Sequence, residues 1–240
     1  MTPYAEPPTS WRPQVVPPKG VEAEPHSTPY SYAVTVLDHE EAVRLYGPWK
    51  HRTPEDAARL LRDYTGRWWV AGGWAIDAFV GSSREHGDLD LGIPRDEAEG
   101  FIEFVSSTFD AWAAAGSLTP ILPNERSEIP DECSNLWLRA SGADPWEYDV
   151  MLESVRSSTW HYKRAPHMTR PFDECLWTRS GISYLRPEIQ LLLKAKHVRA
   201  KDMLDLERCL PHLDSASRTW LETTLRREHP QHPWLSPLTP

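Results

Sequence analysis

The sequence predicts an α+β protein with a mixed-sheet core and a helical C-terminal subdomain. Residues 30–186 alternate short β-branched or apolar runs with helical segments, which is typical of helices packed on a sheet. After Arg186 the pattern changes to three successive helical stretches. Of the 240 residues, 40% are hydrophobic, which is enough for a substantial core.

The chain divides into four predicted parts. Residues 1–29 hold eight of the 23 prolines and show almost no apolar periodicity, so we expect an extended or disordered arm. Residues 30–186 form the main domain and residues 187–228 the helical subdomain. The tail at 229–240 is irregular in sequence, and we expect it to be solvated.

The order of elements begins with a strand at 31–37 and a short helix at 38–45. A stronger helix start follows at Thr53, where a capping hydroxyl precedes Pro54 and two acids. The remaining predicted helices lie at 53–64, 74–80, 94–105, 187–200, 201–210 and 215–227. The remaining predicted strands lie at 68–71, 89–93, 118–122, 135–140, 146–153, 161–164 and 182–185.

Composition argues against several classes of protein. No apolar run approaches the roughly 20 residues of a membrane helix, and the N-terminus lacks the apolar stretch of a signal peptide. We therefore expect a cytoplasmic protein that does not contact the membrane. The three cysteines show no close pairing, which argues against a disulfide framework or a zinc ribbon, and we expect them to be buried. A net charge of −9 makes a nucleic-acid partner unlikely.

One segment carries most of the chemical information. A predicted strand runs into Gly72-Gly73, which opens a helix. Glycines let a ligand approach the backbone, and a helix N-terminus offers N–H groups and a partial positive charge. The turn therefore suits a phosphate group.

Acidic residues follow this turn. Asp88 and Asp90 are two apart on a predicted strand, so we expect both carboxylates on one face. Mg²⁺ usually binds through one or two carboxylates together with substrate phosphates. Asp149, on the predicted strand 146–153, could complete the metal site or take a proton from an attacking hydroxyl.

Each signal alone also has a simpler explanation. A glycine pair before a helix is most often a tight-packing turn, and Asp-x-Asp on a strand is most often a solvated face. The combination in this order, within a strand–turn–helix–strand context, favours a functional site.

The pattern resembles the nucleotidyltransferase superfamily with a DNA polymerase β-like core. The string from Gly72 through Asp77, with Arg84-Glu-His-Gly-Asp-Leu-Asp90, is most similar to the aminoglycoside 2″-nucleotidyltransferase and lincosamide nucleotidyltransferase branch. The segment Tyr184–Lys196, followed by Lys201-Asp202, is similar to that branch's C-terminal helical signature. The resemblance covers about residues 65 to 225.

The resemblance implies roles for the matching residues. Gly72 and Gly73 would hold the nucleotide triphosphate, Asp88 and Asp90 would bind Mg²⁺, and Asp149 would be a metal ligand or general base. Lys194 and Lys201 are seven apart and would share one side of a continuous helix. They would steady the triphosphate or the leaving pyrophosphate, although a solvated helix face explains them equally well. Arg84 could contact phosphate, whereas a local network with Glu85 and His86 is the simpler explanation.

The implied reaction is transfer of AMP from ATP to a hydroxyl of a small-molecule acceptor, aminoglycoside- or lincosamide-like, with release of pyrophosphate. Such an activity would be typical of antibiotic resistance. Two alternatives remain: a toxin-type relative that modifies tRNA or protein, and a non-catalytic nucleotide-binding protein. The 12 tryptophans are expected mainly in the core, with one or two able to stack on adenine or on an acceptor ring. An acidic loop at 123–132 could attract a cationic acceptor, although a solvated loop is the simpler explanation. The sequence leaves the oligomeric state open.

Overall fold

The structure is a computed structural model that describes residues 39–122, 129–196 and 198–239. The predicted Pro-rich arm, the strand at 31–37 and the first residue of the helix at 38–45 lie outside these residues. Residues 38–240 form one compact unit, so the helical C-terminal part belongs to the same unit as the sheet.

The centre of this unit is an eight-stranded sheet with the strand order β10-β11-β1-β2-β6-β5-β3-β4. Its strands are β1 (Trp69–Val70), β2 (Asp90–Pro94), β3 (Asp110–Ala114), β4 (Leu118–Pro120), β5 (Asn135–Arg139), β6 (Tyr148–Glu153), β10 (Leu176–Arg179) and β11 (Ile182–Leu185). The pairs β1–β11 and β2–β6 are parallel and the other pairs are antiparallel. This confirms the predicted mixed sheet. A small second sheet contains β7 (Val155–Arg156), β8 (Thr159–His161) and β9 (Thr169–Pro171).

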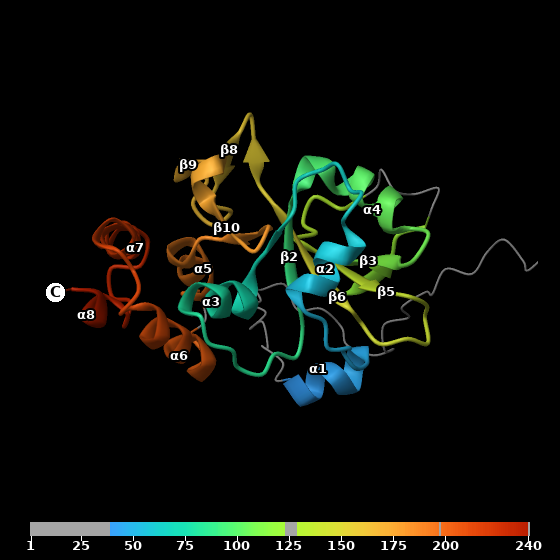
Figure 1. Cartoon of the computed structure of the whole chain (residues 1–240), viewed down its shortest axis with the longest axis horizontal. Coiled ribbons are helices and arrows are strands. Elements are labelled where there is room, and N and C mark those ends of the chain that lie inside the picture. Colours follow the sequence, from blue (N-terminus) through green and yellow to red (C-terminus); the bar gives the residue numbers. More distant parts are fainter. Residues whose placement is uncertain (1–38, 123–128, 197, 240) are drawn as a thin grey trace, which may run out of the picture. The chain divides into compact units, whose positions relative to one another are not determined.

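Eight α-helices lie in the described residues. They are α1 (His39–Tyr46), α2 (Pro54–Leu60), α3 (Gly72–Val80), α4 (Ala98–Val105), α5 (Pro187–Lys194), α6 (Ala200–Cys209), α7 (Ser215–Glu228) and α8 (Leu235–Leu238). Of these, α2, α3, α4 and α5 pack against strands of the sheet. Figure 1 shows α5 to α8 gathered beside α3, apart from α2 and α4. None of the helices in the described ranges is long and apolar enough to cross a membrane.

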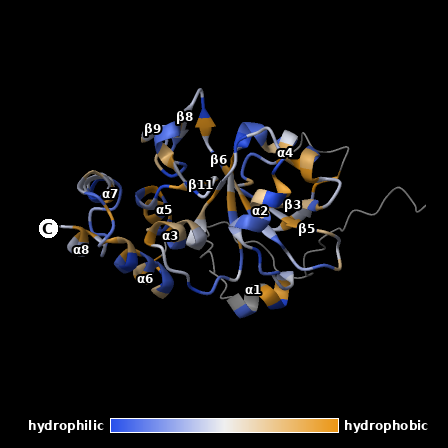
Figure 2. Ribbon diagram, in the orientation of Figure 1, coloured by the Kyte–Doolittle hydropathy of each residue, from blue (hydrophilic) through white to orange (hydrophobic). Residues whose placement is uncertain are grey.

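Two apolar clusters hold these layers together. The first joins α2 and α4 to the sheet through residues such as Leu61 and Phe101. The second joins α3, the small sheet and α5 to α8 through residues such as Trp160, Leu192 and Trp234. In Figure 2, hydrophobic residues concentrate on the central strands, and hydrophilic residues mark outer turns of α6 and α7.

Local sequence explains where the helices begin. At α2, the Thr53 side chain accepts a hydrogen bond from the backbone N–H of Asp56, and the Asp56 carboxylate accepts one from the backbone N–H of Thr53. At α6, the Asp202 carboxylate accepts a hydrogen bond from the backbone N–H of Arg199. This second cap starts α6 at Ala200, beside the predicted boundary between the helices 187–200 and 201–210, whereas α5 ends at Lys194, earlier than predicted.

The predicted tail is packed rather than solvated, which corrects the sequence-based expectation. Residues 235–238 form α8, and the indole of Trp234 is fully buried against the second cluster. The strands β3, β7, β9 and β10 were not predicted from the sequence. Residues 95–97 at the start of the predicted helix 94–105 are a 3-10 turn. The strand predicted at 161–164 lies instead at 159–161.

Candidate active site

The glycine turn joins β1 to α3 and closes against the strand that carries Asp90. Gly72 has a left-handed backbone with φ +63°, and a Cβ at this position would lie 1.6 Å from Asp90 Oδ2. Only glycine therefore permits this approach. The Gly72 N–H donates to Gln190 Oε1 on α5 at 2.7 Å, and α3 has no side-chain N-cap. The first turn of α3 thus presents backbone N–H groups beside a carboxylate, as a phosphate–metal site requires.

Asp90 and Asp149 are neighbours across two strands. They are directly paired in register between the parallel strands β2 and β6, so their side chains share one face of the sheet. Asp88 differs from the prediction, since β2 begins at Asp90 and Asp88 lies just before it in an exposed position. The Asp88 carbonyl accepts a hydrogen bond from Trp74 Nε1 at 3.2 Å, which ties this segment to α3.

The three carboxylates act on one another electrostatically. Burial, together with the charges of Asp88 and Asp149, raises the pKa of Asp90 well above its usual value. Burial and the charge of Asp88 raise the pKa of Asp149 to about 7, against an opposing hydrogen bond from Asn135 Nδ2 to Asp149 Oδ1 at 2.6 Å. A cation among these groups would relieve the repulsion that raises both values.

The donor set fits Mg²⁺ in its chemistry. Carboxylate oxygens are hard ligands, and Mg²⁺ needs only one or two of them when substrate phosphates complete its coordination. Within the described residues, no group of three His, Cys, Asp or Glu side chains is already assembled around a common point. The carboxylates therefore match a site that is completed by a bound triphosphate better than a preassembled protein cage.

Arg84 and His86 form a network beside the glycine turn. His86 Nε2 lies 2.6 Å from Asp77 Oδ2, and its ring stacks on Trp74 with 4.5 Å between centroids. The Asp77 carboxylate also accepts from the Arg84 backbone N–H at 2.8 Å, and Arg84 Nε lies 3.3 Å from Asp205 Oδ1. The local network that the sequence suggested for this loop is present for Arg84 and His86, and Glu85 takes part through its backbone carbonyl, which accepts from Arg84 Nη1 at 2.9 Å.

The same contacts determine ionisation within this network. Burial opposes the charge of Asp77, yet hydrogen bonds from His86 and Arg84 outweigh it and lower the pKa of this carboxyl. Burial lowers the pKa of His86, so its imidazole is neutral near pH 7. A Cβ on Gly73 would lie 2.5 Å from Arg84 Nη2, which places the guanidinium beside the glycine turn. Contact between Arg84 and phosphate stays a prediction.

The two predicted lysines have different surroundings. They do not share one continuous helix, because Lys194 ends α5 and Lys201 lies on α6. Lys194 Nζ is 2.9 Å from Asp205 Oδ2 and 3.3 Å from Asp202 Oδ1, and both of these aspartates are fully buried. Lys201 is exposed. Both ammonium groups act to lower the pKa of Asp90, so both lie within electrostatic range of the carboxylates.

Sequence reasoning missed three groups at this site. Gln190 stands among apolar residues in the segment Ile189–Leu193, and this isolated polar residue was a usable signal. Asn135 opens β5 and carries no such signal. Arg199 stabilises the charge of Asp202 and is itself stabilised by Asp88 and Asp90, which places a third cation on this side of the carboxylates.

The cysteines and the acidic loop that the sequence analysis singled out are not part of this site. The cysteines are free and buried, which confirms their expected packing role. In the acidic loop, the structure describes exposed Asp131 and Glu132, whereas Glu125 and Glu128 lie outside the described residues.

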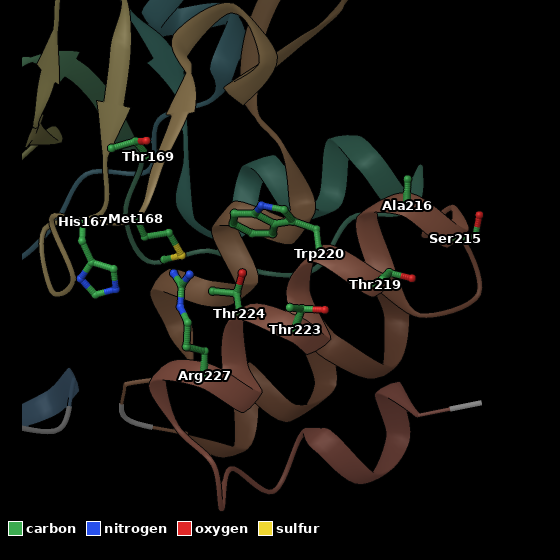
Figure 3. Close-up of a pocket in the computed structure, with 10 residues that line it drawn as sticks. All are labelled: His167, Met168, Thr169, Ser215, Ala216, Thr219, Trp220, Thr223, Thr224 and Arg227. Carbon is green, nitrogen blue, oxygen red and sulfur yellow. The ribbon is translucent and has the colours of Figure 1, made fainter.

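A separate pocket opens beside α7. It has a volume of about 690 Å³, and Figure 3 shows Trp220 and Arg227 of α7 with the segment 167–169 around it. None of its lining residues is a predicted site residue, so the carboxylates remain the candidate active site.

Comparison with known proteins agrees with the two motifs. A family model described as aminoglycoside-2″-adenylyltransferase matches residues 56–110, which include the glycine turn, Asp88 and Asp90 but not Asp149 or the lysines. This confirms the resemblance drawn from the sequence. No curated protein sequence matches the chain.

Solved structures give a more distant similarity. The chain is similar to the lincosamide antibiotic adenylyltransferase LnuA bound to lincomycin, with 16% identity, a TM-score of 0.44, and coverage of 63% of this chain and 90% of that one. It is also similar to ANT(2″)-Ia in complex with adenylyl-2″-tobramycin, with 15% identity, a TM-score of 0.45, and coverage of 71% and 93%. These values are too low to transfer a substrate or a residue's role.

Proposed function

We propose that this chain is an enzyme of the nucleotidyltransferase type that moves AMP from ATP to a hydroxyl of a small-molecule acceptor, with Mg²⁺ as cofactor. The observation that carries the proposal is the contact between the glycine turn and Asp90, with Asp149 directly opposite on the next strand. A phosphate held at the turn would lie beside both carboxylates.

On the donor side, the chain's own residues would bind and orient the triphosphate. The first turn of α3 offers N–H groups, and Lys201 and Arg199 add positive charge on the side of Asp88 and Asp90. Asp90 and Asp88 would hold Mg²⁺, which when bound supplies neutralisation of the charge that develops on the phosphate oxygens.

On the acceptor side, Asp149 is the proposed proton acceptor. Its pKa of about 7 matches the requirement that a general base be near the working pH. The acceptor oxygen would attack the α-phosphorus and form a new P–O bond while the bond to the β-phosphate breaks. The hydroxyl proton would pass to Asp149 and pyrophosphate would leave. Positioning and electrostatics then account for most of the catalysis.

The net charge of the chain indicates which class of acceptor to expect. A net charge of −9 is unfavourable for a nucleic-acid backbone, which supports a small molecule over tRNA. Antibiotics of the kinds named for the similar structures, lincomycin and tobramycin, are therefore the first acceptors to test.

The test uses purified protein with Mg²⁺ and ATP labelled at the α-phosphate. We expect label to move to a small acceptor, whereas label at the γ-phosphate should leave with pyrophosphate. Parallel incubations with tRNA and with cell extract separate the alternatives by product size. Tight Mg-ATP binding without pyrophosphate release from any acceptor would favour a non-catalytic protein.

A further inference from the structure

A buried carboxylate on α6 joins three parts of the chain beside the glycine turn. Asp205 is fully buried, and its two oxygens have different cationic partners. Asp205 Oδ1 lies 3.3 Å from Arg84 Nε, in the loop 81–89 that leads from α3 to β2, and Asp205 Oδ2 lies 2.9 Å from Lys194 Nζ at the end of α5. Figure 1 shows α6 beside α3 and α5. The carboxylate thus connects the loop before Asp90 to the helical C-terminal part.

Arg84 is held at both its backbone and its side chain. Its backbone N–H donates to Asp77 Oδ2 on α3 at 2.8 Å. Its guanidinium faces Asp205, with Nε at 3.3 Å and Nη2 at 3.5 Å from the carboxylate oxygens, while Nη1 donates to the Glu85 carbonyl at 2.9 Å. A planar guanidinium that bonds through several N–H groups has a fixed orientation. The direction of the Arg84 side chain therefore depends on Asp205.

Arg208 links the two carboxylates that hold Arg84. Arg208 Nη1 lies 2.8 Å from Asp77 Oδ1 and 3.7 Å from Asp205 Oδ1. Its Nη2 donates to the backbone carbonyl of Ser82 at 2.6 Å. One guanidinium of α6 thus pairs with α3, with its own helix and with the loop. Asp205 therefore belongs to a set of ion pairs that fixes the loop against both helices.

Asp205 orients Arg84 toward the glycine turn. A Cβ at Gly73 would lie 2.5 Å from Arg84 Nη2, so the guanidinium lies directly against the first turn of α3. The hydrogen bonds to Asp205 and Glu85 use three of its five N–H groups, and the side chain is 29% exposed. Two N–H groups remain for a ligand at this helix N-terminus, where a phosphate is favoured.

We infer that Asp205 is a positioning residue for nucleotide binding, because it orients the Arg84 guanidinium over Gly73, where Arg84 contacts the triphosphate. Asp205 is fully buried, so it acts through Arg84 and does not touch the ligand. The inference rests on the proposed function, since it requires a triphosphate at the glycine turn.

The test is a double-variant cycle on the affinity for Mg-ATP, measured by isothermal titration. Arg84→Gln and Asp205→Asn should each weaken binding about tenfold, from the loss of one charge-assisted phosphate contact. Lys194 keeps a carboxylate partner in Asp205→Asn, because its Nζ also lies 3.3 Å from Asp202 Oδ1. The double variant should bind within about twofold of Arg84→Gln, since Asp205 then has no guanidinium to orient. Mg-pyrophosphate, which lacks the nucleoside, should lose affinity by the same factors.

Glu188→Gln is the matched control for the loss of a buried carboxylate. Glu188 is 1% exposed and accepts from Arg170 Nη1 at 2.8 Å. This variant should unfold at a lower temperature and bind Mg-ATP as the parent protein does. Arg84→Lys tests the same inference without changing a buried group. It keeps the charge but lacks the planar fork that bridges Asp205 and a phosphate, and it should weaken Mg-ATP binding about fivefold or more.

Parent affinity for Mg-ATP in folded Asp205→Asn would overturn the inference, and so would additive losses in the double variant. If Asp205→Asn does not fold, parent affinity in Arg84→Lys overturns it instead. Absence of Mg-ATP binding by the parent protein would count against the proposed function itself.

Discussion

Asp90 and Asp149 lie directly opposite each other on the parallel strands β2 and β6, and Asp90 also touches the backbone of Gly72. The protein thus holds two carboxylates on one face of a rigid sheet against a turn that has no room for a side chain. Such an arrangement costs stability unless a cation is present, because like charges repel and both groups are largely removed from water. The stability of the fold should therefore depend on pH when Mg²⁺ is absent.

Stability without Mg²⁺ should fall as the pH rises through the range in which Asp149 ionises. The pKa of Asp149 is raised from 3.8 to about 7, so the folded state keeps a proton that the unfolded state has already released. The stability from this proton is fully present below pH about 3.8 and is lost by pH about 7. The asparagine in Asp149→Asn is uncharged at every pH. The free energy of unfolding of this variant should therefore change with pH by roughly 2–4 kcal/mol less than that of the parent protein.

The measurement is urea unfolding of both proteins in the presence of a chelator, at about four pH values between about 4.5 and 8. Glu99→Gln is the control, because Glu99 is an exposed side chain on α4. Equal pH slopes for the parent protein and Asp149→Asn would contradict the interpretation.

Gly72→Ala should abolish transfer. The new Cβ would displace the Asp90 carboxylate, and alanine at φ +63° adds about 1–2 kcal/mol of backbone strain. Gly100→Ala is the matched control, since this glycine is within α4 and a Cβ there meets nothing within 4 Å. It should stabilise the fold by about 0.5–1 kcal/mol and leave transfer unchanged. Thermal unfolding with labelled-AMP transfer checks both, and an active Gly72→Ala protein would show that the close approach is unnecessary.

Lys194 and Lys201 should separate into a structural and a functional lysine. Lys194→Met removes one of the cations that pair with buried Asp202 and Asp205, which keep their arginine partners, and should destabilise the protein by about 2 kcal/mol. Lys201→Met should keep the parent melting temperature and raise the KM for ATP, because the exposed ammonium faces Asp88. Calorimetry and ATP titrations distinguish the two, and an equal loss of stability in both variants would contradict this division.

The sequence predicted the turn and the strands that carry the candidate site residues better than the connections around them. The glycine turn, Asp90 and Asp149 each belong to an element with a strong local signal, and β11 has its predicted bounds at Ile182–Leu185. β3 was not predicted because four of its five residues, one aspartate and three alanines, are poor strand formers, and pairing with β5 and β4 places them in the sheet.

Tertiary contacts determine two further features that the local sequence pattern does not predict. The break between α5 and α6 depends on Asp202, whose carboxylate caps the new helix and pairs with Lys194. The sequence predicts the helix boundary at 200–201, but nothing in the local periodicity predicts that the first helix already ends at Lys194. Likewise, the Trp137–Asp149 pairing needs the register of β5 against β6, which no single strand's sequence contains.

Isothermal titration of Mg-ATP into the parent protein and into the Asp88→Asn/Asp90→Asn double variant tests the central claim most directly. We predict Mg²⁺-dependent binding to the parent and its loss in the double variant, while the matched variant Glu99→Gln binds as the parent does. Unaltered Mg²⁺-dependent nucleotide binding by the double variant would contradict the assignment of these carboxylates.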